Sequence, residues 1–137
     1  MRNLSLLLLL ISFVVTTLSG CTFDKKIDSN LYTYTKISGD EAKKIMNEDD
    51  SVIILDVRTE EEYNQGHIEE ALLIPSTELT KRASEELSNK DATILVYCRS
   101  GNRSARAAQK LIDAGYTNVY DFGGIIDWEY EIIKYEE

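Results

Sequence analysis

Residues 93–104 of this chain read TILVYCRSGNRS. The first five predict a buried strand, because a strand covered on both faces reads as one continuous apolar run. The next seven are polar and contain a glycine, and an alanine-rich helical pattern follows at 104–114. The order of strand, short loop and helix therefore places Cys98 beside the first turn of a helix.

This position predicts a reactive thiol. Unpaired N–H groups and the helix dipole favour negative charge there, and a Cys in such surroundings has a pKa below its ordinary value of about 8.5. Gly101 permits a backbone that curls its N–H groups inward as an anion-binding nest. An inert core thiol is the alternative interpretation. Cys98 is the expected nucleophile, and the expected anion-binding loop comprises Arg99, Ser100, Gly101, Asn102, Arg103 and Ser104, the last also as a helix cap.

The rest of the chain alternates strands with helices. A second apolar run at 52–55 predicts a buried strand, and capping boxes at 38–41 and 59–62 predict helices. Together these patterns predict an α/β fold, with a small, mostly parallel sheet and helices on both faces. Strands are expected at 52–55, 71–74, 93–97 and 118–122, a turn at Gly123-Gly124, and helices at 39–47, 59–65, 77–87, 104–114 (with Ala105, Ala108 and Ile112 on its packing face) and 125–135.

Ligands of such sheets bind beyond the carboxyl ends of the strands. Cys98 lies at one such end, and Asp56 and Arg58 lie at another, so we expect them to face one crevice. Asp56 and Arg58 fit an ion pair, with acid–base catalysis as the alternative, and Arg58 could also gather an anion. His67, the single histidine, fits a structural role at a turn, with pairing to Cys98 as the alternative. The sequence contains no cluster of cysteines that would indicate a metal site, and no cofactor is expected.

The N-terminus predicts export. Arg2 precedes an apolar stretch at 4–18, which is shorter than the roughly 20 residues that span a bilayer as a helix. Residues 18–21, LSGC, resemble a bacterial lipobox, which implies cleavage before Cys21 and a lipid on that Cys. An ordinary cleaved signal and an uncleaved anchor are the alternatives. The expected organisation is a lipoprotein signal peptide at 1–20, a tether at 21–33 and one domain at 34–137, lipid-anchored outside the cytoplasm of a bacterium.

The composition excludes a nucleic-acid partner. The chain carries 24 Asp and Glu against 15 Lys and Arg, a formal net charge of −9, whereas nucleic-acid binding requires a basic stripe. This acidity also disfavours broad adhesion to anionic lipid headgroups, so a lipid on Cys21 would provide the anchor. The expected state is a monomer.

Several segments together resemble the rhodanese sulfurtransferases. The resemblance runs from about Tyr34 to Ile133 and implies a rhodanese-like fold and transfer of a sulfane sulfur through a persulfide on Cys98. It further implies a small anionic donor such as thiosulfate, a cyanide-like or thiol acceptor, and contact of Arg103 with substrate. Capping and bracing of the loop is the alternative role of Arg103. The segments that carry it are Asp56-Val57-Arg58, Glu62, Gly66-His67-Ile68, residues 71–75, the loop at 98–104, Gly123-Gly124 and Trp128.

Two other functions remain open. Cysteine phosphatases, including those with a rhodanese-like fold, carry five residues between Cys and Arg, and their longer cradle fits a tetrahedral oxyanion. Here four residues separate Cys98 from Arg103, a smaller cradle that suits a single sulfur atom. The other alternative is a non-enzymatic module that holds a persulfide for a partner protein.

Overall fold

A parallel five-stranded sheet forms the centre of the protein. The structure, a computed structural model, describes residues 33–135. All four strand pairings in that range are parallel, and the spatial order is β1-β5-β4-β2-β3. The predicted α/β class is confirmed. The strands are β1 (Thr35–Lys36), β2 (Ile53–Asp56), β3 (Leu72–Leu73), β4 (Thr93–Cys98) and β5 (Asn118–Gly124).

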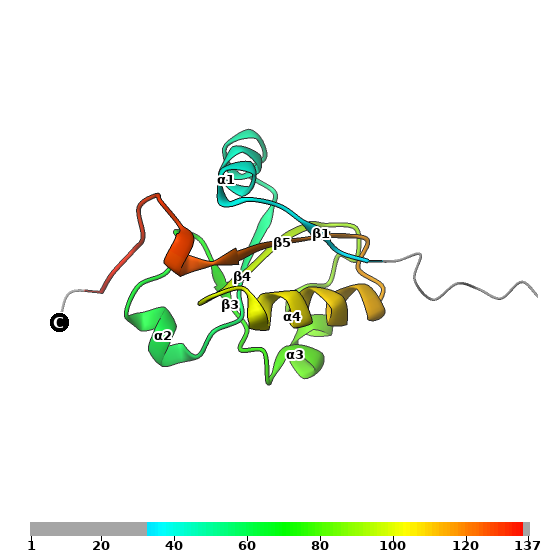
Figure 1. Cartoon of the computed structure of the whole chain (residues 1–137). Helices are drawn as coiled ribbons and strands as arrows, with labels where there is room; N and C mark the ends of the chain where they lie inside the picture. Colours follow the sequence, from blue (N-terminus) through cyan, green and yellow to red (C-terminus); the bar gives the residue numbers. More distant parts are fainter. Residues whose placement is uncertain (1–32, 136–137) are drawn as a thin grey trace, which may run out of the picture.

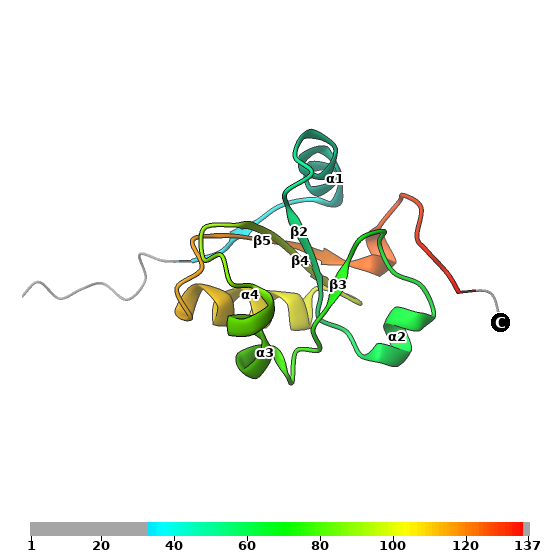
Figure 2. The ribbon, with the colours of Figure 1, turned by 180° about the vertical axis from the view of Figure 1, so that it is seen from behind.

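Helices cover both faces of this sheet. Helix α1 lies on one face, whereas α3 and α4 lie on the other, and α2 lies at one end of the molecule beside the C-terminal segment (Figures 1 and 2). None of the helices between residues 33 and 135 is long and apolar enough to cross a membrane. The helices are α1 (Gly39–Glu48), α2 (Glu60–Asn64), α3 (Leu79–Glu86), α4 (Asn102–Asp113) and the 3-10 turn η1 (Ile125–Asp127).

Both predicted capping boxes are present. Ser38 caps α1 and Thr59 caps α2, and each accepts a hydrogen bond from the N–H of the Glu three residues later. Each Glu carboxylate in turn accepts from the capping residue's N–H, at 2.8 Å for Glu41 and 3.0 Å for Glu62. These reciprocal bonds satisfy N–H groups that a helix start otherwise leaves unpaired, so both helices begin where the sequence predicts.

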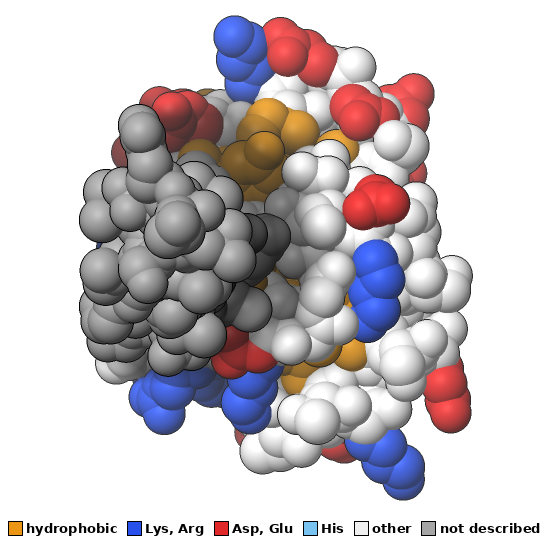
Figure 3. Space-filling view, turned by 90° about the vertical axis from the view of Figure 1, so that its right-hand side faces the viewer, with side chains coloured by type: hydrophobic (Ala, Val, Ile, Leu, Met, Phe, Trp, Pro, Cys, Tyr) orange, Lys and Arg blue, Asp and Glu red, His pale blue; other side chains and the backbone are white. Residues whose placement is uncertain are grey.

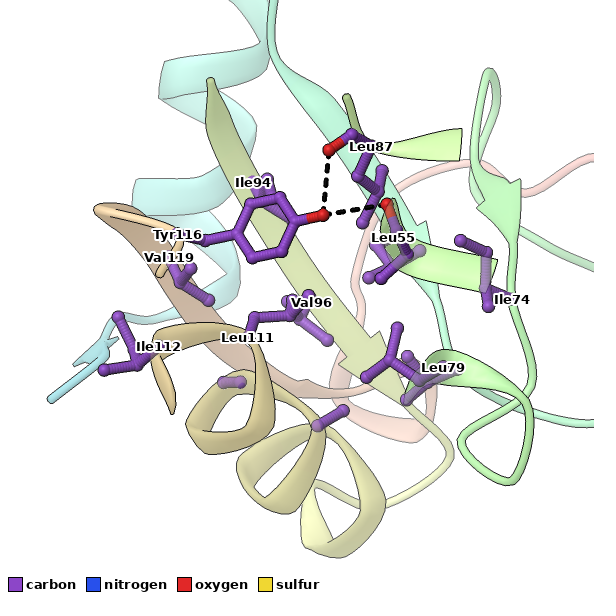
Figure 4. Packing of buried hydrophobic residues seen from close by; sticks show 14 of the residues in the cluster. Leu55, Ile74, Leu79, Leu87, Ile94, Val96, Leu111, Ile112, Tyr116 and Val119 are labelled. Carbon is purple, nitrogen blue, oxygen red and sulfur yellow. Dashed lines mark hydrogen bonds between the residues drawn. The ribbon is translucent and has the colours of Figure 1, made fainter. Parts of the chain in front are cut away.

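Strand β4 separates two hydrophobic cores because its side chains alternate between faces. Ile94, Val96 and Cys98 pack into the larger core under α3 and α4, whereas Leu95 and Tyr97 pack into the core under α1. Figure 4 shows the larger core, in which the buried Tyr116 hydroxyl donates to carbonyl groups at the end of α3. The continuous apolar run of β4 thus has the double-sided burial that the sequence predicts.

The strand order creates the crevice. From β2 the chain moves outward to β3 and then returns on the other side of β2 to β4 and β5. The loops that leave β2 and β4 therefore diverge, and such a switch point is where open α/β sheets bind ligands. Asp56 ends β2 and Cys98 ends β4, so both lie at this edge as expected.

The predicted helix at 125–135 is wrong. Only η1 is helical, and the chain beyond it is irregular, with a bend at Tyr130, until Ile133 pairs with His67 in an antiparallel bridge. Gly123 and Gly124 do not form a turn, because they continue β5. Ile125 and Trp128 pack against the core under α1, whereas Ile132 lies against Gly66, so tertiary contacts overrode a weak local preference for helix.

Two smaller details also differ. Helix α4 begins at Asn102, and its buried face includes Ala107 and Leu111, with Ala105 only half-buried. Strand β1 was not predicted, because two exposed residues carry no periodic signal. It pairs with β5 at the edge of the sheet.

On the face shown in Figure 3, positive and negative side chains are interspersed. The signal peptide at 1–20, lipidation at Cys21 and most of the tether at 21–33 lie outside the described residues. These expectations and the monomeric state stay predictions.

Candidate active site

The loop after β4 surrounds the sulfur of Cys98. The Cys98 side chain is buried, and the Gly101 N–H donates to its Sγ at 3.1 Å. Gly101 has φ +95°, a left-handed conformation that glycine adopts without steric cost, and it is the N-cap of α4. The predicted strand-loop-helix geometry therefore places the thiol at the start of α4.

Ser104 is the second contact of the sulfur. Its Oγ lies 3.6 Å from Cys98 Sγ and donates to the carbonyl groups of Gly101 and Gly123. Ser104 is buried within the first turn of α4, so the prediction that it caps the helix is wrong. Its hydroxyl instead ties the loop to β5 beside the sulfur.

These contacts decide the charge state of the thiol. Burial alone would raise the pKa of Cys98, since a thiolate is poorly solvated there. Hydrogen bonding with the N–H and hydroxyl of Ser104 and with the N–H groups of Gly101 and Ser100 outweighs burial, and the pKa is lowered. The thiolate is the nucleophilic form of Cys, so the loop prepares a reactive sulfur without a side-chain base.

Gly124 packs directly against the backbone of the cysteine loop. A Cβ placed on Gly124 would lie 2.6 Å from the Ser100 Cα and would also collide with the Arg99 carbonyl oxygen. The loop can pass this close only because β5 carries no side chain there. Sequence reasoning placed Gly124 in a turn and missed this role, although the pair of glycines was the available signal.

The two arginines of the loop differ in their surroundings. Arg103 donates to both carboxylate oxygens of Glu62, each at 2.7 Å. Arg99 is exposed, and its carbonyl oxygen accepts from the Ile126 N–H at 3.2 Å. Sequence reasoning gave Glu62 no separate role, and its place in the capping box was the only local signal. Asn102 is exposed in the first turn of α4.

Asp56 and Arg58 form the predicted buried ion pair. Arg58 Nη2 donates to Asp56 Oδ2 at 2.6 Å and to the Gly66 carbonyl at 2.7 Å, and Nε reaches both Asp56 oxygens at 3.0 Å. The guanidinium also lies 5.5 Å from the centre of the Tyr97 ring. These contacts fasten the end of β2 to the turn after α2.

His67 lies in the same turn. Its Nδ1 is 3.0 Å from the Tyr63 carbonyl oxygen, and its ring stacks on the Tyr63 ring at 3.7 Å. In the described residues the Cys98 sulfur lies within hydrogen-bond distance of the Gly101 N–H and the Ser104 hydroxyl, and no hydrogen bond joins it to His67. The geometry around His67 is thus the structural one, and pairing with Cys98 is not observed.

A cleft of about 560 Å³ adjoins the loop at Arg99. Its walls include Arg99, the chain neighbour of Cys98, and Glu62, the partner of Arg103. Between residues 33 and 135, no three His, Cys, Asp or Glu side chains gather as metal ligands would. The arrangement therefore offers a nucleophilic sulfur, a set of N–H donors for an anion and space for a substrate.

Known proteins are similar to this chain in sequence. The Rhodanese-like domain family matches residues 38–131. "Thiosulfate sulfurtransferase PspE" of Escherichia coli is 38% identical over 73 residues, which are 53% of this chain and 70% of that protein. "Putative sulfur carrier protein YrkF" of Bacillus subtilis is 37% identical over 100 residues, which are 72% of this chain and 53% of that protein.

A solved structure agrees with these relatives. A "rhodanese with anions from E. coli" superimposes with a TM-score of 0.57 at 35% identity, covering 61% of this chain and 98% of that one. The family match covers more than half of the chain, and the structural similarity agrees with it. The chain belongs to the rhodanese-like family, which includes sulfurtransferases among its homologues.

Proposed function

We propose that the protein is a sulfurtransferase that carries a sulfane sulfur on Cys98. The observation that supports this most is the contact of 3.1 Å between the Gly101 N–H and Cys98 Sγ at the start of α4. A persulfide is anionic near neutral pH, and inward N–H groups stabilise such an anion without a general base. The named thiosulfate sulfurtransferase among the relatives supports the same proposal.

The reaction proceeds in two displacements. In the first, the Cys98 thiolate attacks the sulfane sulfur of thiosulfate, a new S–S bond forms, and sulfite leaves with the electron pair of the broken S–S bond. In the second, cyanide or a thiolate attacks the outer sulfur and leaves as thiocyanate or as a persulfide. The Cys98 thiolate is thereby restored, which is the pattern of covalent catalysis by an activated nucleophile.

The residues of the loop have different roles in this reaction. The Gly101 N–H donates to the sulfur, the Ser104 Oγ lies 3.6 Å from it, and Asn102 is the first residue of α4. Arg103 and Arg99 supply positive charge for an anionic donor, although the charge of Arg103 is balanced by Glu62. Asp56, Arg58 and His67 support the crevice from the side of β2 and its following turn.

Loop size argues against a phosphatase. N–H donors stabilise a charged atom only within about 2.7–3.1 Å of it, and a nest that already contacts one sulfur cannot also reach three phosphoryl oxygens. Purified protein should therefore transfer sulfur from thiosulfate to cyanide and should leave an aryl phosphate unhydrolysed. Efficient phosphate hydrolysis that is lost in Cys98→Ser would reverse this assignment.

A sulfur-carrier role is the second candidate, and one relative with "sulfur carrier" in its name favours it. Turnover separates the two functions, because an enzyme releases many product molecules per site whereas a carrier gives a single burst with small acceptors. Cys98→Ser should abolish both while retaining the circular dichroism of the wild type. Single-burst behaviour at saturating thiosulfate and cyanide would favour the carrier.

We also propose that the chain is exported and anchored by a lipid on Cys21. The support is the sequence LSGC after the apolar stretch at 4–18. In cells fed a labelled fatty acid, the wild type should take up label and Cys21→Ala should not. A wild-type chain recovered without lipid and beginning elsewhere than Cys21 would contradict the anchor.

A further inference from the structure

The C-terminal segment returns to the active-site region. We define residues 132–135 as the C-terminal strap; they lie beyond residue 131, where the family match ends. The Ile133 N–H donates to the His67 carbonyl at 2.7 Å, and the His67 N–H donates to the Ile133 carbonyl at 2.9 Å. Figure 1 shows this segment in red beside α2.

The strap packs closely against the turn after α2. A Cβ on Gly66 would lie 2.9 Å from the Ile132 Cδ1 and 3.4 Å from the Lys134 Cγ, so the glycine permits the approach. The Tyr135 ring lies 5.6 Å from the ring of His67. These contacts hold Ile132 and Lys134 in the wall of the cleft of about 560 Å³ that adjoins the cysteine loop.

The cleft is larger than the small reactants need. Pockets of about 300–1,000 Å³ hold organic ligands, whereas thiosulfate and cyanide are only a few atoms in size. Its apolar lining comes from Ile125, Ile126 and Ile132, and Ile126 is 62% exposed. Such a wall suits a carbon skeleton better than an inorganic ion.

The charged side chains that line the cleft favour binding of an anion. Arg58 is neutralised by Asp56, and Glu62 is neutralised by Arg103. Within the part of the chain that the structure describes, Arg99 and Lys134 form no ion pair, and Glu61 is the one other carboxylate in the lining. Among the described residues, two unpaired cations therefore face one unpaired carboxylate in a cleft whose wall includes Arg99, the chain neighbour of Cys98.

We propose that Arg99 and the C-terminal strap form a subsite for an organic acceptor thiol that carries a carboxylate. Lys134 and Arg99 bind the carboxylate, and Ile126 and Ile132 contact the carbon chain. The acceptor thiolate then attacks the outer sulfur of the Cys98 persulfide, an S–S bond forms, and the Cys98 thiolate leaves with the electrons of the broken bond. The turnover part of this inference rests on the proposed function.

Turnover with three acceptors tests the subsite. The acceptors are 3-mercaptopropionate, 2-mercaptoethanol and cyanide, and the variant is Lys134→Gln. It should lower kcat/KM for 3-mercaptopropionate by about twofold to fivefold, the size of one partly exposed charge contact, and leave the other two unchanged. Lys81→Gln, an exposed lysine of α3 outside the lining, is the matched control. Equal losses for all three acceptors, or no loss for 3-mercaptopropionate, would overturn the proposal.

The apolar wall has its own test. Ile126→Ser should lower kcat/KM for both organic thiols and leave cyanide unchanged, because cyanide has no carbon chain to contact the wall. An unchanged rate with both organic thiols would remove Ile126 from the subsite.

A second readout does not depend on sulfur transfer. Iodoacetate and iodoacetamide have nearly the same shape and differ by one negative charge, so their relative rates of Cys98 alkylation report the local charge. Lys134→Gln and Arg99→Gln should lower the ratio of iodoacetate to iodoacetamide, whereas Lys81→Gln should not. Peptide masses assign the modification to Cys98 rather than Cys21. A lowered ratio in a protein that transfers no sulfur would reject the proposed function but keep the anion subsite, and an unchanged ratio would reject the subsite.

Discussion

Arg103 and Glu62 are joined by two hydrogen bonds of 2.7 Å, one to each carboxylate oxygen. The same carboxylate accepts from the Thr59 N–H at 3.0 Å as the capping box of α2. A residue of the cysteine loop is thereby fastened to the first turn of a helix that lies 41 residues earlier. The pair thus fixes the position of a cation at the end of the loop.

Glu62→Gln should destabilise the protein by about 1–2 kcal/mol, between the values of an exposed ion pair and a buried charged hydrogen bond. The amide keeps the shape but offers one acceptor where the carboxylate offers two. Urea unfolding measures the change, and Glu60→Gln, an exposed neighbour in the same helical turn, is the control. Equal stability of the two variants would contradict a structural role for the pair.

The same pair predicts a pH dependence. The hydrogen bond from Arg103 is the main cause that lowers the pKa of Glu62 from 4.5 to about 2. A carboxylate with a lowered folded-state pKa contributes stability above its unfolded pKa, and this contribution is lost as the pH falls through the folded value. The stability difference between wild type and Glu62→Gln should therefore be constant above pH 5 and shrink between about pH 4.5 and 2. A difference that grows on acidification would contradict the assignment.

Gly124→Ala should abolish sulfur transfer, because the new Cβ would occupy the space of the Ser100 backbone. The loop would have to move away from β5, and the contact of Gly101 with the sulfur would be lost. Gly115→Ala is the control: Gly115 has φ +93° and no atom within 4 Å of an added Cβ. The Gly115→Ala variant should lose about 1–2 kcal/mol of folding stability, because alanine is disfavoured in the left-handed conformation. It should remain active. Full activity of Gly124→Ala in a thiosulfate–cyanide assay would show that the loop does not depend on this contact.

Ser104→Ala should raise the pKa of Cys98, since the hydroxyl is one of the groups that lower it. The titration of the thiolate ultraviolet absorbance measures this change, and alkylation near neutral pH should slow several-fold. Ser84→Ala, at an exposed position of α3, should leave both unchanged. A lower pKa in Ser104→Ala would mean that the hydroxyl stabilises the neutral thiol instead.

The elements that sequence predicted best are those whose signals are local. The apolar runs of β2 and β4, the two capping boxes and Gly115 after α4 (φ +93°) each follow from neighbouring residues. The loop at Cys98 was predicted for the same reason, because strand, glycine and helix follow one another in the chain. Local patterns also placed Cys98 and Asp56 at one edge of the sheet.

The features that sequence missed depend on distant contacts. Ile133 pairs with His67 across 66 residues of chain, so the helical spacing of 125–135 was misleading. Two contacts form only when the folded chain brings β5 and α2 to the loop. They are the close packing of Gly124 against the loop and the ion pair of Arg103 with Glu62. No spacing rule in the sequence connects residues that lie so far apart in the chain. The family resemblance identified Glu62, Arg103 and Gly124, but not the contacts that they make.

The most direct test of the central claim is the intact mass of the purified protein after treatment with thiosulfate. The account predicts a gain of one sulfur atom, its loss on addition of cyanide, and neither change in Cys98→Ser with an unaltered circular dichroism spectrum. Sulfur that loads equally well on Cys98→Ser, or a wild-type protein that never gains the mass while thiocyanate is still produced, would contradict a persulfide on Cys98.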